Sequence, residues 1–216
     1  MSAGSRRRAL YPVSDDGFPA GSMMLKRGLD IAGACLGLLL LFPLLFLAAL
    51  AIAIESPGAP LFRQRRGGHR GASFLVYKFR TMRVREDGPD VVQAKPGDER
   101  ITRVGGFLRR TSIDELPQLL NVLRGEMSLV GPRPHAVSHD QFYGKRIANY
   151  QARFLLRPGL TGLAQVSGLR GQTPDVAAMA ARVDKDLEYI RRWSLMMDIE
   201  IIARTVKVVI VGSAAY

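Results

Sequence analysis

The longest apolar stretch of the chain runs from Ile31 to Ile54, 24 residues without a charged side chain. As a helix it would measure roughly 36 Å, enough to cross the hydrocarbon core of a bilayer. It begins too deep in the chain and is too long for a signal peptide. Its lone cysteine, Cys35, is typical of a small apolar residue in such a run. The pattern therefore predicts a membrane-embedded segment over residues 26–56, preceded by a mobile polar tail over residues 1–25.

Pro43 lies in the middle of this apolar run, where it removes a helical hydrogen bond and bends or breaks the helix. Lysine and arginine favour the cytoplasmic side of a membrane. Basic residues flank the run at both ends: Lys26 and Arg27 before it, and Arg63, Arg65, Arg66 and Arg70 after it. We therefore expect a re-entrant helix, broken at Pro43, with both ends on the cytoplasmic side. A simple span stays open, because membrane helices also tolerate proline.

Short strand-like and helix-like patterns follow over residues 57–216, which we expect to form one cytoplasmic catalytic domain. Residues 59–82 predict two short strands around a Gly/Arg turn, with Phe74, Val76 and Phe79 facing inward. The polar residues 84–99 predict a surface loop. Residues 101–110 predict a short helix with Val104, Phe107 and Leu108 on its apolar face.

Helical spacing of apolar residues returns further along the chain. Residues 114–123 predict a helix that ends at Gly125, and 142–154 predict an amphipathic stretch. Residues 175–192 and 195–211 predict two longer amphipathic helices, the second with Ile199, Ile202, Val206 and Val209 on one face. The expected fold class is mixed α/β and mainly helical, a small domain on the membrane surface with amphipathic interfacial helices.

The net charge of +12 narrows the choice of partner because it is unevenly distributed. Residues 57–110 alone carry 13 Lys/Arg against 5 Asp/Glu, which indicates an anionic partner such as a phosphorylated substrate, acidic lipid or nucleic acid. Aromatic residues make up only 7% and do not alternate with the basic ones, so we expect no nucleic acid partner. The spacing of Cys and His matches no zinc site.

The stretch Ser112-Ile113-Asp114-Glu115 has two interpretations. Ser-x-x-Glu is the pattern of a capping box with Ser112 as the first cap. Pro117 favours a helix that starts at Asp114 instead, because proline is tolerated only in the first turn. Arginines gather around the pair, and arginine suits bidentate phosphate binding, so helix capping and phosphate chemistry both stay open. A carboxylate held beside arginines should stay ionised.

Four segments resemble the bacterial sugar transferase family, the monotopic phosphoglycosyl transferases. They are KFRTM at residues 78–82, RRTSIDELPQLLNVLRGEMSLVGPRP at 109–134, RPGLTG at 157–162 and DLEYIRRWSLMMDIEII at 186–202. The resemblance implies transfer of a sugar 1-phosphate from a UDP-sugar to undecaprenyl phosphate, with release of UMP, at the cytoplasmic face of the bacterial inner membrane. This reaction starts exopolysaccharide assembly. The resemblance also implies Mg²⁺ and a helix break at Pro43, although Phe42 stands where many members carry serine.

Carried onto this chain, the resemblance makes Asp114 the nucleophile toward the β-phosphate and Glu115 its partner. The same two carboxylates are the expected Mg²⁺ ligands. Arg109 and Arg133 match phosphate-binding positions, and the stretch 166–175 is similar to members that transfer glucose rather than galactose. Further expected substrate contacts are Lys78, Arg80 and Arg157.

Other polar residues are expected at the surface, including His135 and His139, whose spacing lacks a third metal ligand. For Asp186 and Tyr189 a surface position and an active-site role are equally open. We expect contact with membrane lipids, and the Gly/Arg turn is assigned to their headgroups. The sequence leaves homo-oligomer formation open. The alternative function is a membrane-tethered basic scaffold or nucleic-acid-binding protein without catalysis.

Overall fold

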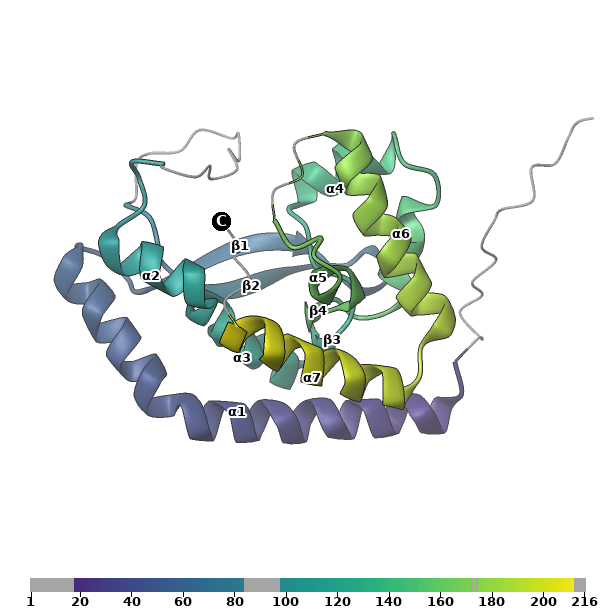
Figure 1. The fold of residues 1–216 in the computed structure, drawn as a ribbon, viewed down its shortest axis with the longest axis horizontal. Coiled ribbons are helices and arrows are strands. Elements are labelled where there is room, and N and C mark those ends of the chain that lie inside the picture. Colours follow the sequence, from purple (N-terminus) through teal and green to yellow (C-terminus); the bar gives the residue numbers. More distant parts are fainter. Residues whose placement is uncertain (1–17, 84–97, 172, 174, 212–216) are drawn as a thin grey trace, which may run out of the picture.

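The computed structural model describes residues 18–83, 98–171, 173 and 175–211, with side chains given up to residue 208. The fold is mixed α/β and mainly helical, as expected (Figure 1). The longer elements are α1 (Ala20–Glu55), β1 (Leu61–Gly67), β2 (Ser73–Phe79), α2 (Arg103–Thr111), α3 (Leu119–Arg124), α4 (Val137–Gly144), α6 (Val176–Arg192) and α7 (Leu195–Val211). Shorter ones are η2 (His69–Gly71), η3 (Ile113–Gln118), β3 (Ser128–Val130), η4 (Tyr150–Leu155), β4 (Gly159–Thr161) and α5 (Leu163–Val166).

Helix α1 begins at Ala20, earlier than the predicted start at residue 26, so residues 20–25 are helix rather than tail. The rest of the predicted tail, up to residue 17, lies outside the described residues. Helix α1 continues through Pro43, whereas we expected a break there. Figure 1 shows α1 changing direction along its length, as expected of a helix that contains proline. Among the described residues, α1 is the one helix long and apolar enough to cross a membrane.

Both ends of α1 are attached to the same globular part. At the N-terminal end, Lys26 Nζ donates to Val130 O at 3.0 Å and to Asp198 Oδ2 at 2.6 Å. At the C-terminal end, the Glu55 carboxylate accepts hydrogen bonds from the backbone N–H of Val104 at 3.1 and 3.2 Å. Between these ends, large apolar side chains stay exposed, including Leu36, Leu39, Leu40, Phe42, Phe46 and Leu47.

Strands β1 and β2 form an antiparallel hairpin whose register runs from Leu61 opposite Phe79 to Gly67 opposite Ser73. Phe74, Val76 and Phe79 are buried, as predicted. Strands β3 and β4 form a second, parallel pair that the sequence analysis did not predict. Each has three residues, too short for an alternating pattern to stand out. This small sheet sets the position of the Gly-Pro-Arg-Pro turn that follows β3.

The helices follow the predicted spacing, with local differences. Thr102 caps α2 by accepting from the Gly105 N–H at 2.9 Å, and Gly125 ends α3 in the left-handed conformation at φ 79°. Leu108 is buried as predicted, but Phe107 is 52% exposed, so its place on the buried face was wrong. The predicted stretch 142–154 is not one helix but the end of α4, a turn and η4. The predicted loop 84–99 lies almost wholly outside the described residues.

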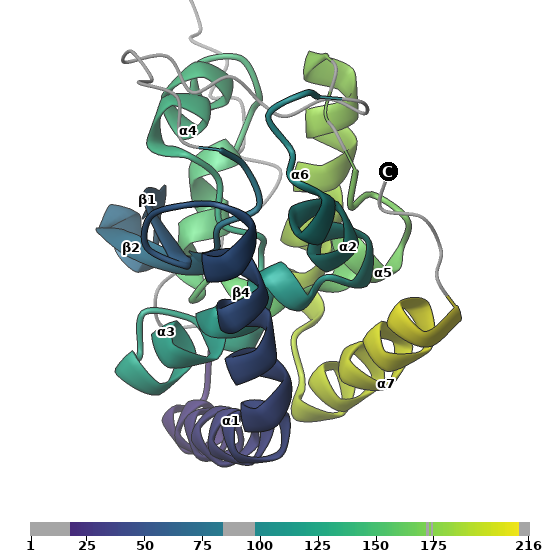
Figure 2. The same cartoon turned by 90° about the vertical axis from the view of Figure 1, so that its left-hand side faces the viewer.

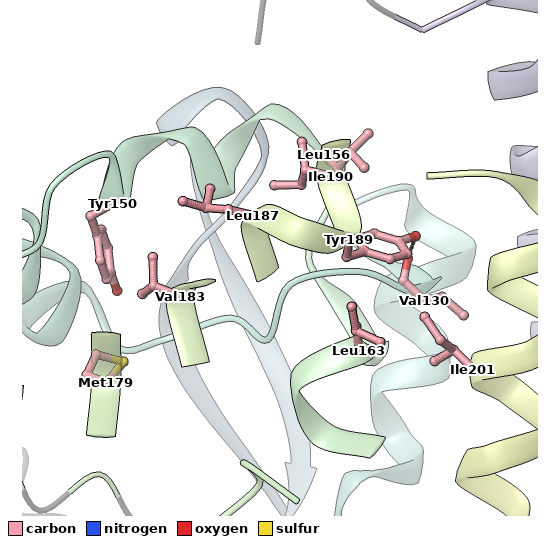
Figure 3. Close-up of a cluster of buried hydrophobic side chains, with 10 residues drawn as sticks. All are labelled: Val130, Tyr150, Leu156, Leu163, Met179, Val183, Leu187, Tyr189, Ile190 and Ile201. Carbon is pink, nitrogen blue, oxygen red and sulfur yellow. Dashed lines mark hydrogen bonds between the residues drawn. The ribbon is translucent and has the colours of Figure 1, made fainter. Parts of the chain in front are cut away.

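Helix α7 lies alongside α1 in both views (Figures 1 and 2). Ile199, Ile202 and Val206 on α7 are exposed, whereas Ile201 is buried. Ile201 belongs to the largest buried cluster, in which α6, α7, β3 and η4 meet (Figure 3). The members are Val130, Tyr150, Leu156, Leu163, Met179, Val183, Leu187, Tyr189, Ile190 and Ile201. The exposed stripe of α7 thus points away from the core, on a helix that runs beside the apolar α1.

Candidate active site

Asp114 and Glu115 lie in the 3-10 turn η3, between α2 and α3. The chain enters this turn through Ser112, whose left-handed conformation at φ 60° ends α2. The prediction that a helix starts at Asp114 was therefore wrong, and neither reading of the capping pattern applies because η3 has no side-chain cap. Pro117 lies within the 3-10 turn, which precedes the regular helix α3. The turn presents the two adjacent carboxylates to different surroundings.

Glu115 is the carboxylate that receives the cations. Lys78 Nζ donates to its Oε1 at 2.7 Å, and Arg133 forms a two-pronged pair with Nη2 to Oε1 at 2.5 Å and Nη1 to Oε2 at 3.1 Å. Burial pushes the pKa of Glu115 upward, but Arg133 and Lys78 outweigh it and hold that pKa well below its ordinary range. Glu115 is therefore an anion at any pH near neutrality.

Asp114 is only partly buried, and burial is the main reason why its pKa rises to about 6. The neighbouring charge of Glu115 raises this pKa further, while Lys78, Arg109 and Arg133 partly oppose the rise. We expected a carboxylate beside arginines to stay ionised, and Arg109 and Arg133 do lower the pKa of Asp114, although burial and Glu115 raise it more. A carboxylate with a pKa near 6 is mostly ionised at pH 7 yet more basic than an ordinary aspartate. Such a group is suited to nucleophilic attack.

The β1–β2 hairpin delivers two cations to the site from its inner face. Lys78 stands opposite Phe62 and Arg66 opposite Phe74, so the two cations share one face of the hairpin. Arg66 Nη1 donates to Pro134 O at 3.4 Å. Burial and the nearby Arg133 lower the pKa of Arg66 to about 10. The sequence analysis had assigned the Gly/Arg turn to lipid headgroups and did not predict Arg66 at the site.

The structure does not bring every predicted residue to the carboxylate pair. Strand β2 ends at Phe79, so Arg80, which we expected to contact substrate, lies just beyond the strand. Its guanidinium donates instead to Ser56 O at 2.7 Å and Pro57 O at 2.6 Å, at the end of α1. Arg157 Nε donates to Gly125 O at 2.9 Å, at the end of α3. Both side chains bind backbone carbonyls that hold neighbouring elements in place.

A buried polar network supports Arg133 from behind. Arg153 Nη2 donates to Arg133 O at 2.7 Å, and Arg153 Nε donates to Asp186 Oδ2 at 2.8 Å. His135 Nδ1 lies 2.9 Å from Arg153 Nη1 and must accept, because a guanidinium can only donate. His135 and Asp186 are 5% and 1% exposed, so the surface position expected for His135 was wrong. Tyr189 is buried as well, against Asp198.

Asp114 has the carboxylate that best fits a metal ion. Both oxygens of Glu115 already face Lys78 or Arg133, whereas no hydrogen bond or ion pair to Asp114 is found among the described residues. No cluster of three acidic, His or Cys ligands occurs in the part of the chain that the structure describes. Mg²⁺ suits such a site, since it is commonly bound by one or two carboxylates and completed by substrate phosphate oxygens.

Comparison with known proteins shows the family of the chain. The model of the family described as bacterial sugar transferase matches residues 21–212. The chain belongs to the bacterial sugar transferase family. The match includes α1, the hairpin, the carboxylate turn and both long C-terminal helices.

Individual relatives carry more specific names. A UDP-glucose:undecaprenyl-phosphate glucose-1-phosphate transferase of Caulobacter vibrioides is 60% identical over 191 residues, 88% of this chain and 72% of the relative. One of the same name from Escherichia coli is 49% identical over 96% of this chain but only 45% of its own length. An exopolysaccharide production protein of Rhizobium leguminosarum is 47% identical, over 85% of this chain and 94% of the relative. The chain thus spans less than half of the longer E. coli relative.

Proposed function

We propose that this protein transfers glucose 1-phosphate from UDP-glucose to undecaprenyl phosphate and thereby starts exopolysaccharide synthesis. The observation that carries the proposal is the difference in ion-pair partners and pKa between two adjacent carboxylates. Glu115 forms ion pairs with Lys78 and Arg133, while Asp114 beside it has a pKa of about 6. The names of the relatives from Caulobacter vibrioides and Escherichia coli supply the sugar and the acceptor.

In the first half-reaction, an oxygen of the Asp114 carboxylate attacks the β-phosphorus of UDP-glucose. A bond forms between Asp114 and phosphorus, the bond from phosphorus to the bridging oxygen breaks, and UMP leaves with that oxygen. The product is glucose 1-phosphate held as an acyl phosphate on Asp114. The anionic diphosphate repels a carboxylate, so the cations around Glu115 stabilise the charge that builds up as the bond forms.

In the second half-reaction, a phosphate oxygen of undecaprenyl phosphate attacks the same phosphorus and Asp114 leaves as a carboxylate. The lipid then carries a diphosphate linked to glucose. Glu115 has too low a pKa to serve as a proton acceptor at neutral pH, and its role is to hold Lys78 and Arg133 beside the reacting phosphate. Two successive displacements predict ping-pong kinetics.

Asp114, with substrate phosphate oxygens, is the group that would hold Mg²⁺, and Glu115 lies next to it. When bound there, the ion would supply positive charge that screens the diphosphate from the attacking carboxylate. The chain's own contribution is the set of cations that Glu115 holds, Lys78 and Arg133.

The attachment of both α1 ends to one body supports a re-entrant helix at the cytoplasmic face of the inner membrane. Lys26 reaches Asp198 and Glu55 reaches Val104, both in the globular part. A helix that spanned the bilayer would hold these two ends on opposite sides. The exposed apolar residues of α1, together with the exposed stripe on α7, are suited to contact with lipid acyl chains.

The first experiment measures UMP release by detergent-solubilised protein with Mg²⁺, undecaprenyl phosphate and a panel of UDP-sugars. UDP-glucose should give the highest rate, and Asp114→Asn should abolish it while the protein stays folded. Folded protein that releases no UMP from any donor would sink the proposal and favour a non-catalytic scaffold. Salt-sensitive binding of DNA by that inactive protein would favour the nucleic-acid alternative.

A further inference from the structure

Arg170 reaches the carboxylate turn from a distant part of the chain. It lies in the turn between α5 and α6, and its Nη2 donates to Ser112 Oγ. The same nitrogen lies 3.9 Å from Glu115 Oε2, and the side chain is 22% exposed. Arg170 is therefore beside the proposed reaction centre and still open to solvent. It lies within residues 166–175, for which the sequence indicated the choice of sugar but no individual contact.

The charge of Arg170 is weakly compensated in this position. Glu115 is already bound by Lys78 and Arg133, whose closest contacts are 2.7 and 2.5 Å. Arg170 is farther from that carboxylate, and its hydrogen-bond partner Ser112 is a neutral hydroxyl. A guanidinium held this way keeps donors for an anionic ligand, and it binds phosphate oxygens in a two-pronged manner when one arrives.

A second, buried arginine holds the backbone on both sides of Arg170. Arg182 of α6 donates from Nε to Leu169 O at 2.9 Å and from Nη2 to Gly171 O at 2.5 Å. Arg182 is 6% exposed, and its burial lowers its pKa to about 10. Burying a cation is unfavourable unless it is well bonded, and these bonds go to the two carbonyls that flank Arg170.

The turn itself is shaped to present this residue. Gly168 has φ 84°, in the left-handed region that favours glycine, and it reverses the chain after α5. The Leu169 N–H then donates to Ala164 O at 3.0 Å, which ties the turn back to α5. Arg170 is thus a partly exposed residue of a short turn whose backbone is held on both sides of it. Its side chain reaches from there to Ser112.

We propose that Arg170 binds a phosphate group of the substrate and that Arg182 is its positioning residue. The inference rests on the proposed function and adds to it a cation from residues 166–175, the stretch that is similar to glucose-transferring members. The incoming phosphate replaces Ser112 as the partner of Arg170. The source of that phosphate is either the UDP-sugar diphosphate or the phosphate of the lipid acceptor, which share this chemistry.

The first test measures binding of UDP, in the presence of Mg²⁺, by calorimetry, which needs no turnover. Arg170→Gln should weaken binding roughly 10- to 100-fold, the range expected for loss of a charge-assisted contact, if the donor diphosphate is the ligand. Arg170→Lys, which keeps the charge without the fork, should fall between Gln and wild type. Ser112→Ala, which removes the hydrogen bond but keeps the cation, should stay within about twofold to threefold.

The two half-reactions separate the two sources of phosphate. UMP release in a single turnover without acceptor reports the donor, and discharge of the sugar-phosphate enzyme to undecaprenyl phosphate reports the acceptor. A defect of Arg170→Gln in the first step assigns the donor diphosphate, and a defect confined to the second assigns the acceptor phosphate. Normal rates in both steps would overturn the proposal, as would an equal defect in Ser112→Ala, which would make Arg170 a mere support of the turn.

Arg182 is tested through its dependence on Arg170. Arg182→Lys should lower the same rate as Arg170→Gln, but it should add nothing in the Arg170→Gln background. A merely structural role would lower activity equally in both backgrounds. Gly168→Ala provides a second variant if Arg182→Lys unfolds, because a Cβ there meets no atom within 4 Å and only the turn conformation is strained. Wild-type protein without UMP release would refute the proposed function instead, and UDP binding would still test Arg170.

Discussion

Arg133 and Glu115 form a two-pronged pair, with nitrogen–oxygen distances of 2.5 and 3.1 Å, 18 residues apart in the chain. Arg133 lies in the turn that follows β3, and its own carbonyl is bound by the buried Arg153. The pair is therefore fixed from both sides, by a side-chain fork at the front and a hydrogen bond at the back. These contacts limit the movement of the Arg133 guanidinium, the positive charge that faces the substrate in the proposed function.

Replacing Arg133 by lysine should impair catalysis even though the positive charge is kept. Lysine keeps the positive charge but cannot bind both oxygens of Glu115. We expect kcat/KM for UDP-glucose to fall by about 10- to 100-fold, as for loss of a charge-assisted hydrogen bond. Arg124→Lys is the matched control, because Arg124 stacks on Tyr77 away from the pair, 4.8 Å from the ring centre. Equal effects of the two substitutions would contradict this reading.

The pH dependence should report Asp114. Attack requires the ionised carboxylate, whose pKa is about 6, so single-turnover UMP release should fall about tenfold per pH unit below that value. Lys78 lowers this pKa, so Lys78→Met should move the acid limb to higher pH. His135 should add no limb near neutrality, because burial and the adjacent Arg153 hold its pKa well below the ordinary range. An acid limb near pH 4 in the wild type would argue against Asp114.

Asp114→Asn should be inactive yet more stable than wild type at pH 8. The folded-state pKa of Asp114 lies above its ordinary value of 3.8, so ionisation opposes folding. The stability linked to this group is fully present below about pH 4 and is lost as the pH rises through about 6. We expect a gain on the order of 1 to 3 kcal/mol at pH 8 that disappears at pH 4. Thermal unfolding of both proteins across this range measures it.

The buried pair between Lys26 and Asp198 should be costly to break on one side only. Their side chains are 6% and 8% exposed, so Lys26→Met leaves Asp198 buried without its cation. We expect a loss of about 3 to 5 kcal/mol in the free energy of unfolding. Adding Asp198→Asn to Lys26→Met should restore part of it, because the uncompensated charge disappears. Strictly additive losses in detergent would show that the pair does not couple the two helices.

Two neighbouring glycines of α2 should respond in opposite directions to alanine. A Cβ at Gly105 would come within 2.1 Å of Thr81 O, so Gly105→Ala must displace backbone, and we expect a loss of about 1 to 3 kcal/mol. A Cβ at Gly106 meets its nearest atom at 3.8 Å, so Gly106→Ala should stabilise the helix by about 0.5 to 1 kcal/mol. Thermal unfolding midpoints compare the two variants directly.

The carboxylate pair could be identified in the sequence, but the different partners and pKa values of its two members could not. Asp114 and Glu115 are adjacent and look equivalent in any local pattern. Their difference arises because Lys78 and Arg133 arrive from a strand and a turn elsewhere in the chain, and both bind Glu115. Helix capping was the obvious local interpretation. It was wrong because Ser112 adopts the left-handed conformation and its side chain does not cap the turn.

Long-range contacts also explain the remaining differences. Arg170 meets Ser112 across 58 positions, and no periodicity or motif spacing links a turn to a turn at that distance. His135 was expected at the surface because polar residues usually are, yet it accepts from Arg153 within a buried network. The strongly periodic elements, α6 and α7, were predicted correctly because their apolar spacing is local information.

The two attachments of α1 also set an order of events during synthesis. Glu55 meets Val104, only 49 positions later, whereas Lys26 meets Asp198, 172 positions later. The C-terminal end of α1 can therefore dock while the middle of the chain is still being translated. The N-terminal end can already contact Val130, 104 positions after Lys26, but Lys26 gains its acidic partner Asp198 only after nearly the whole protein has been made. The ion pair that joins α1 to α7 is thus available only at the end of synthesis, after the hairpin and the carboxylate turn have been translated.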